Sequence, residues 1–214
     1  MKKYILSTLL LLCAAAQGAW ADTWDGSISQ PAYDSSRGVY VIKKGAELAY
    51  IHQHWDACYK NSYSLEEDLD LSRFIWIPLG QGGSQFEGTF YGNSHTIELV
   101  IENATANYQG LFADIDSKGR VLDLHVSGKI QCDDSRLVGG IAGQNDGDII
   151  NCWVSANVSS NFTTWKSTTA KVGGIVGENN GLVSLCCMTG DVQNHDADVG
   201  GCRPGRVHLP GLLF

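Results

Sequence analysis

The chain has 214 residues, which is long enough for one domain with a substantial core. Hydrophobic residues make up 43% of it and charged residues 18%, so an intrinsically disordered chain is excluded. The formal charge of −8 argues against nucleic acid as a partner. Glycine is abundant, with 25 residues against 4 prolines, and we expect many of these glycines to form corners with positive φ.

The N-terminus has the pattern of a signal peptide. Two lysines precede an apolar run of signal-peptide length, and Ala19-Trp20-Ala21 supplies the small residues of a cleavage site. We expect residues 1–21 to be removed and the protein to be exported. The apolar run is too short to span a membrane, and no later run is longer, so no transmembrane helix is expected. A lipoprotein anchored at Cys13 is the alternative, although Leu12 stands where a small residue is needed.

Residues 22–73 are interpreted as a cap that covers the N-terminal end of the fold, because the exposed strand edges of a repeat protein must be covered. Residues 39–42 have the composition of a short strand. Leu48, Ile51 and Trp55 then recur at helical spacing, which predicts a short amphipathic helix over residues 46–55.

The second half of the chain contains an internal repeat. Val138-Gly139-Gly140-Ile141-Ala142-Gly143 returns 34 positions later as Val172-Gly173-Gly174-Ile175-Val176-Gly177. Gly110-Leu111-Phe112-Ala113 is a looser, earlier copy. A polar turn follows each copy and ends at a glycine. These three glycines are Gly119, Gly147 and Gly181.

Alignment of the copies on these glycines produces columns of apolar residues, where a column is a set of equivalent positions in successive repeats. The two central columns lie two residues apart, which is the period of a strand. The four columns are Val121, Ile149 and Val183; Leu124, Cys152 and Cys186; Val126, Val154 and Met188; and Ile130, Val158 and Val192.

These repeats predict an all-β fold, a single-stranded parallel β-helix over residues 74–201. A repeat of about 30 residues holds no helical pattern, so helices cannot connect its strands. Equivalent strands would pair about 4.8 Å apart, and each repeat would bury its apolar face against the next. We expect a right-handed coil from the chirality of parallel crossovers.

The glycine-rich segments resemble the GLUG repeat of bacterial surface proteins, which also occurs near the N-terminal regions of immunoglobulin A1-type peptidases and in haemagglutinin-like adhesins. Three upstream segments are similar to motifs that accompany it, and the resemblance covers roughly residues 40–201. It implies a parallel β-helix on an exported bacterial protein, and it brings no common catalytic residues. The three segments are LEEDLDLS at residues 65–72, WIPLG at 76–80 and FEGTFYGNSHTI at 86–97.

Residues 202–214 do not continue the repeat. Val199-Gly200-Gly201 begins another glycine-rich corner, but two prolines and two arginines follow and the columns end. One interpretation is a frameshift or a premature stop in a longer repeat protein. The other is a native tail that plugs the open end with Leu212, Leu213 and Phe214.

The candidate chemistry is sparse. His52, His54 and Cys58 are ligand types close in sequence, but no second cluster accompanies them, so no metal site is predicted. The even count of six cysteines after residue 21 permits a disulfide framework. Because Cys152 and Cys186 belong to an interior column, we interpret them as small buried hydrophobic residues.

An enzyme has little support in the sequence. The metalloprotease and nucleophile-elbow motifs do not occur. Asp123 aligns with Asn151 and Leu185, so these positions supply no acidic column for a glycan-cleaving β-helix.

The outward column of His125, Trp153 and Cys187 is either an aromatic binding strip or a surface covered by a loop over residues 159–171, and we favour the covered surface. The sequence therefore predicts a secreted or cell-surface scaffold of a Gram-negative bacterium, used for adhesion or display and without catalysis, cofactor or metal. Its surface ligand is unknown, and a glycan and a host protein are the candidates. The alternatives are a glycan-active β-helix enzyme and a truncated, non-functional fragment of a longer surface protein.

Overall fold

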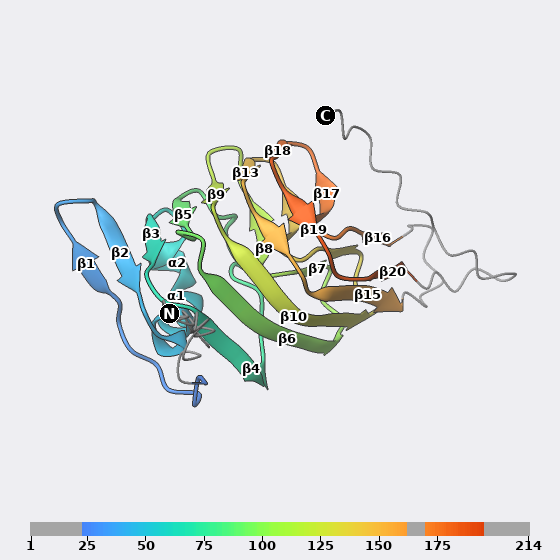
Figure 1. The fold of residues 1–214 in the computed structure, drawn as a ribbon, viewed down its shortest axis with the longest axis horizontal. Helices are drawn as coiled ribbons and strands as arrows, with labels where there is room; N and C mark the ends of the chain where they lie inside the picture. The colour runs from blue at the N-terminus through green and yellow to red at the C-terminus, as the bar shows by residue number, and fades with distance from the viewer. Residues whose placement is uncertain (1–22, 162–169, 195–214) are drawn as a thin grey trace, which may run out of the picture.

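The computed structural model describes residues 23–161 and 170–194. The predicted signal peptide with Ala19 and Ala21, and the tail over residues 202–214, lie outside this part of the chain. The described residues form mainly strands in parallel sheets, with two short helices near the N-terminal end, as Figure 1 shows. The fold is therefore all-β, as the sequence predicts.

The strands form four sheets. The first contains β1 (Ala32–Asp34), β2 (Val39–Ile42), β3 (Tyr63–Leu65), β5 (Thr89–Tyr91), β9 (Arg120–Leu122), β13 (Asp148–Ile150) and β18 (Leu182–Ser184). The second contains β4 (Leu69–Ile75), β6 (Thr96–Ala104), β10 (His125–Asp133), β14 (Trp153–Val154), β15 (Asn157–Asn161), β19 (Cys187–Met188) and β20 (Val192–Asn194). The third contains β7 (Tyr108–Gln109), β11 (Leu137–Val138) and β16 (Lys171–Val172). The fourth contains β8 (Phe112–Ile115), β12 (Ala142–Asn145) and β17 (Val176–Asn179).

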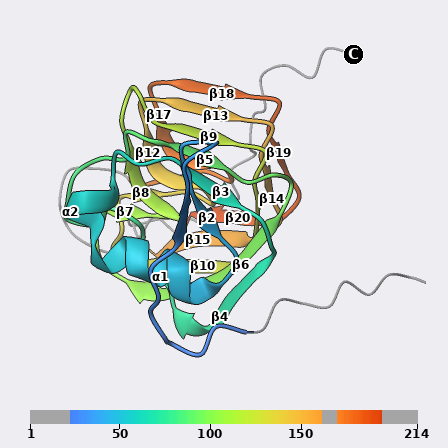
Figure 2. The ribbon, with the colours of Figure 1, turned by 90° about the vertical axis from the view of Figure 1, so that its left-hand side faces the viewer.

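The chain visits these sheets in a constant order. From β9 in the first sheet it passes to β10 in the second, β11 in the third and β12 in the fourth, and it returns to the first sheet at β13. Each strand pairs in parallel with its equivalents, so that β13 lies between β9 and β18, and β12 lies between β8 and β17. Figure 2 shows β5, β9, β13 and β18 stacked one above another.

The register of these pairs stacks apolar side chains inside the molecule. In the first sheet, Tyr63, Phe90, Val121 and Ile149 are at most 2% exposed. Burial of such a side chain stabilises a fold by about 1.5–3 kcal/mol, so the stacked columns are the main source of stability. One column of the first sheet holds Tyr40, Tyr63, Phe90, Val121, Ile149 and Val183. Two columns of the second sheet hold Leu69, Ile97, Val126, Val154 and Met188, and Ile101, Ile130, Val158 and Val192.

A left-handed corner joins the first sheet to the second in three successive repeats. Asp123, Asn151 and Leu185 have φ values of 53°, 54° and 55°. The residue after each corner, Leu124, Cys152 or Cys186, packs into the hydrophobic core. The Asn151 amide also donates a hydrogen bond to the Asp123 carboxylate at 2.6 Å. Asp and Asn adopt this backbone region far more readily than Leu does, so Leu185 is the strained member of the series.

Most glycines of the repeated motif act through close packing, which corrects our expectation of positive φ for them. Positive φ does occur at six described glycines, of which Gly110 belongs to the motif; the others are Gly26, Gly38, Gly80, Gly82 and Gly128. A Cβ on Gly139 would lie 2.6 Å from the Val176 Cα of the next repeat, and one on Gly147 would lie 2.2 Å from the Gly119 oxygen of the preceding repeat. Neighbouring repeats thus approach so closely that a side chain at these positions would meet backbone. Six described motif glycines have no positive φ, namely Gly139, Gly140, Gly143, Gly173, Gly174 and Gly177.

A buried asparagine stabilises the turns between the fourth sheet and the first. Asn145 is fully buried, and its amide donates to Asn179 Oδ1 at 2.7 Å and to the Gly147 carbonyl oxygen at 3.1 Å. Its own Oδ1 accepts a hydrogen bond from the Gly147 amide at 3.2 Å. The Asn145 side chain therefore pairs with backbone polar groups of its own turn and links this turn to Asn179 in the next repeat.

Two helices and a hairpin cover the N-terminal end. Helix α1 (Gly45–Gln53) buries Leu48 and Ile51, and α2 (Trp55–Cys58) follows it, so the single helix predicted over residues 46–55 is divided in two. Strand β1 pairs antiparallel with β2 at the edge of the first sheet. Parallel pairing begins at β2 and β3, inside the segment that we interpreted as the cap.

We expect Leu185→Asn to raise the free energy of unfolding by about 1 kcal/mol. A left-handed φ costs leucine roughly 1–2 kcal/mol, and asparagine tolerates it better. Leu185 is 78% exposed, so little burial is lost. Chemical denaturation measures the change. The control is Leu182→Asn, at a 48% exposed residue without positive φ, which should bring no gain. Equal effects of the two substitutions would contradict the strain at residue 185.

Candidate functional site

The outer face of the second sheet carries an aromatic strip, which we define as Thr96, His125, Trp153 and Cys187. These residues come from β6, β10, β14 and β19 and lie opposite one another in the pairing register. Side chains alternate across a strand, and their neighbours Ile97, Val126, Val154 and Met188 point inward to the core. The strip therefore crosses four neighbouring strands on the outside of the molecule.

Trp153 is the exposed centre of this strip. It is 49% exposed, and its ring stacks on His125 with a centroid distance of 5.0 Å and an interplanar angle of 25°. The indole Nε1 donates a hydrogen bond to Thr189 Oγ1 at 3.2 Å. The stack and this hydrogen bond hold the ring in place, and about half of its surface is exposed. Phe162 and Trp165, from the loop that we expected to cover it, lie outside the described residues.

His125 is held between two hydroxyl groups. Its Nδ1 lies 3.1 Å from Thr96 Oγ1, and its Nε2 lies 2.9 Å from Ser155 Oγ. Burial lowers the pKa of His125, and the negative charge of Asp68 opposes this only in part. A neutral imidazole has one donor and one acceptor nitrogen, and each hydroxyl can complement either. The tryptophan therefore rests on a neutral, hydrogen-bonded ring at pH 7.

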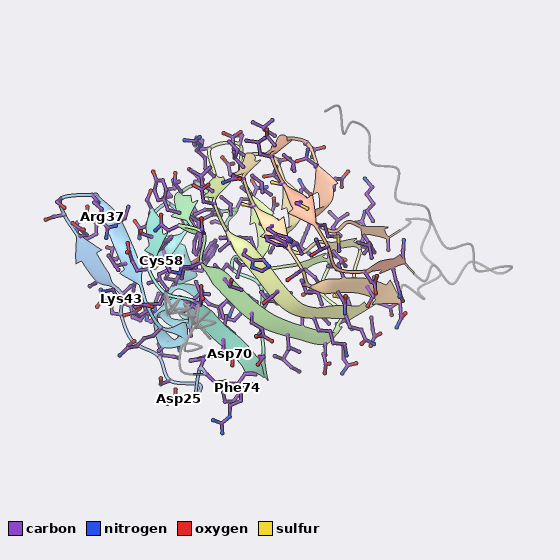
Figure 3. All side chains as sticks on the ribbon, in the orientation of Figure 1. Asp25, Arg37, Lys43, Cys58, Asp70 and Phe74 are labelled. Carbon is purple, nitrogen blue, oxygen red and sulfur yellow. The ribbon has the colours of Figure 1, made fainter. Side chains whose placement is uncertain are left out.

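Two carboxylates lie beside the strip on adjacent strands. Asp70 on β4 is opposite Glu98 on β6, and Ser127 on β10 follows in the same row; Figure 3 labels Asp70 near the N-terminal end of the molecule. Burial, and then the charge of Asp70, raises the pKa of Glu98. Burial alone would also raise the pKa of Asp70, but hydrogen bonds from Ser72 and Thr23 outweigh it and lower that pKa.

Sequence reasoning did not find this acidic pair. The columns were aligned from Gly119 onward, and both acids precede that point. The available signal was the alternation of acidic and apolar residues in Leu69-Asp70-Leu71 and in Ile97-Glu98-Leu99, which is typical of a strand with one outward face. Extending the alignment toward the N-terminus would have placed these two acids side by side.

The ligand-type residues near α1 do not converge. His52 packs against Trp76 with ring centroids 6.0 Å apart, whereas His54 stacks on Tyr50 at 4.0 Å. Cys58 is a buried free thiol. Over residues 23–161 and 170–194, no three His, Cys, Asp or Glu side chains are grouped to hold a metal ion.

Comparison with known proteins identifies a GLUG motif in the chain. The motif matches residues 134–159, which begin directly after β10 and end within β15. The chain is also 31% identical over 136 residues to a protein of Evansella cellulosilytica named "Putative Gly-rich membrane protein". That alignment covers 59% of this chain and 16% of the relative, so the chain spans about a sixth of the relative's length. No solved structure is significantly similar to the chain.

These similarities, together with the repeated sheets, show a repeat protein that contains a GLUG motif. In the part of the chain that the structure describes, neither helix has the length and apolar character needed to cross a bilayer.

We expect acid to destabilise the wild type more than a His125→Gln variant. The pKa of His125 is lower in the folded state than its unfolded value of about 6.5, so unfolding takes up a proton between the two values. The stability that neutral His125 contributes is complete above the unfolded value and is lost as the pH falls below it. Urea unfolding between pH 7 and pH 5 measures the difference between the two proteins. Identical pH profiles would show that His125 is not held neutral.

Proposed function

We propose that the chain forms a single-stranded parallel β-helix, and that its coil is right-handed. The support is the constant order of the four sheets and the parallel pairing of successive repeats. The handedness follows from the strong right-handed preference of parallel crossover connections. A repeat of this kind extends a continuous outer surface without changing the fold.

On this fold, the protein would act as a non-catalytic scaffold for adhesion or display on the surface of a bacterium. The GLUG motif, the relative's name and the signal-peptide pattern support this location. The sequence resemblance to the repeats of haemagglutinin-like adhesins and immunoglobulin A1-type peptidases supports the same role. The chain spans only a small part of the relative's length. A surface role for the whole protein is therefore part of the same proposal.

The ligand that fits the aromatic strip best is a glycan. The observation that carries this proposal is the half-exposed Trp153 ring, fixed flat on His125 and bordered by hydroxyl groups. The C–H face of a sugar packs on an aromatic ring, and its hydroxyls pair with polar side chains at the ring's edge. Thr189 Oγ1 lies at the indole edge and Ser155 Oγ bonds the His125 ring on which the indole stacks. The acids Glu98 and Asp70 lie in the same sheet, two and three strands away from Trp153.

A Trp153→Ala variant should lose glycan binding by tenfold or more. A glycan array selects the ligand, and calorimetric titration then compares the variants. Loss of the stacking face removes most of the contact area on the sugar, whereas the fold should persist because the side chain is half exposed. Tyr91→Ala is the control, at a 39% exposed aromatic residue in the first sheet, and it should bind as the wild type does. Equal loss in both variants, or none in either, would refute the strip as the binding surface.

A glycan-active enzyme is the second candidate, and the acidic pair favours it. Glycoside hydrolases use two carboxyl groups, a protonated acid and an ionised base or nucleophile. Glu98 has the raised pKa that the acid needs, and Asp70 has the lowered pKa of its partner.

Hydrolysis assays on the glycans that bind separate the two candidates. If the protein is an enzyme, Glu98→Gln should lower the rate by about 100-fold or more, the usual loss on removing a general acid. Glu102→Gln, farther along the same strand and paired with Lys129, should keep the rate. Absence of product with the wild-type protein would support the scaffold and reject the enzyme.

A further inference from the structure

The structure stacks two cysteines in neighbouring repeats. Cys152 and Cys186 each follow a left-handed corner residue. The backbones beside them are hydrogen-bonded. The backbone N–H of Asn151 donates to the Ser184 carbonyl oxygen at 3.0 Å, and the backbone N–H of Cys187 donates to the Cys152 carbonyl oxygen at 3.0 Å. Adjacent parallel strands lie about 4.8 Å apart, and a disulfide joins Cα atoms about 4.4–6.8 Å apart. The spacing of the two repeats is therefore within the range of a disulfide.

The two thiols also have the same orientation. Cys152 Sγ lies 3.6 Å from the Val121 oxygen, and Cys186 Sγ lies 3.6 Å from the Ile149 oxygen, the equivalent atom one repeat later. Each Sγ further contacts a carbonyl oxygen of its own corner at 3.3 Å. The side chains thus lie one above the other along the column, and the thiols interact with each other.

The pair differs in accessibility and in acidity. Cys152 is 2% exposed, whereas Cys186 is only partly buried because it belongs to the last described repeat. A hydrogen bond from the Cys152 thiol lowers the pKa of Cys186 to about 7 and raises that of Cys152. The thiolate is the nucleophile in disulfide exchange, so Cys186 is the attacking residue and Cys152 the one that resolves.

We propose that Cys152 and Cys186 are a modification site, at which a disulfide forms between the two repeats when the protein meets a low-molecular-weight disulfide. The Cys186 thiolate attacks one sulfur of the reagent, forms a mixed disulfide and releases one thiolate. Cys152 then loses its proton to solvent and attacks Cys186 Sγ, which releases the second thiolate. Two protein thiols are oxidised and one external disulfide is reduced to two thiols, so atoms and electrons balance.

The bond would fix the last described repeat to its neighbour. Strands β16 to β20 pair on one side with the preceding repeat, and their inward residues Val183, Cys186 and Met188 are less buried than the equivalents before them. A covalent link here restricts local opening of this repeat as well as the unfolded chain. An exported protein meets the oxidising conditions in which such a bond persists.

Oxidised glutathione is the probe for this site. The folded protein is incubated with it, unreacted thiols are blocked, and a tryptic digest is analysed by mass spectrometry without reduction. Lys171 separates the peptides that carry the two cysteines. We expect a linked pair of peptides, present in Cys187→Ser and absent in Cys186→Ser. The buried thiols of Cys58 and Cys132 should remain reduced and serve as internal controls.

Limited proteolysis gives a second measurement. Oxidised wild type should be cleaved within residues 171–194 about tenfold more slowly than reduced wild type, whereas Cys186→Ser should show no difference. A link that is lost in Cys187→Ser and kept in Cys186→Ser would overturn the proposal. A stable mixed disulfide on Cys186 without the link, or a pair that stays reduced in excess reagent, would also overturn it.

Discussion

Equivalent residues of neighbouring repeats must fit into the narrow spacing between paired parallel strands, and the rest of the structure follows from this constraint. Each interior side chain packs on its own counterpart one repeat away, as Val126 does on Val154. At the turns from the fourth sheet to the first, the spacing leaves no room for a side chain, and a Cβ on Gly181 would lie 2.1 Å from the Gly147 oxygen. Stacking therefore accounts for most glycines of the repeated motif. Corner conformation is a separate requirement, and Asp123 and Asn151 satisfy it.

The same spacing determines whether a polar side chain inside a column finds a hydrogen-bond partner. A buried amide is tolerated when its donors and acceptor are all paired, and the stacking places a partner directly above Asn145. The thiols of Cys152 and Cys186 are paired in a similar way, because each sulfur contacts a carbonyl oxygen of the preceding repeat. The interior therefore accepts a small polar side chain at a repeated position, provided that the neighbouring repeat supplies its complement.

Much of the fold was accessible from the sequence because a repeat makes long-range pairing visible as local similarity. The offsets of 28 and 34 residues between Val121, Ile149 and Val183 coincide with the observed register. The role of the motif glycines was not accessible, since a sequence does not distinguish a glycine required by φ from one required by close approach. The acidic pair was missed because β4 and β6 lack the glycine-rich motif on which the alignment depended.

The constraint also locates the surface on which recognition is possible. Since the interior is filled by columns, a ligand must bind the outward residues, and the sheets differ in how much surface they offer. Strands of the third sheet span two residues and those of the fourth span four, whereas β6 and β10 in the second sheet span nine each. Outward residues of the first sheet partly neutralise one another, as Arg120 and Asp148 do. The second sheet combines the longest strands with an exposed aromatic ring and two acids, so variation of its outward residues would change the ligand while the inward residues preserve the fold.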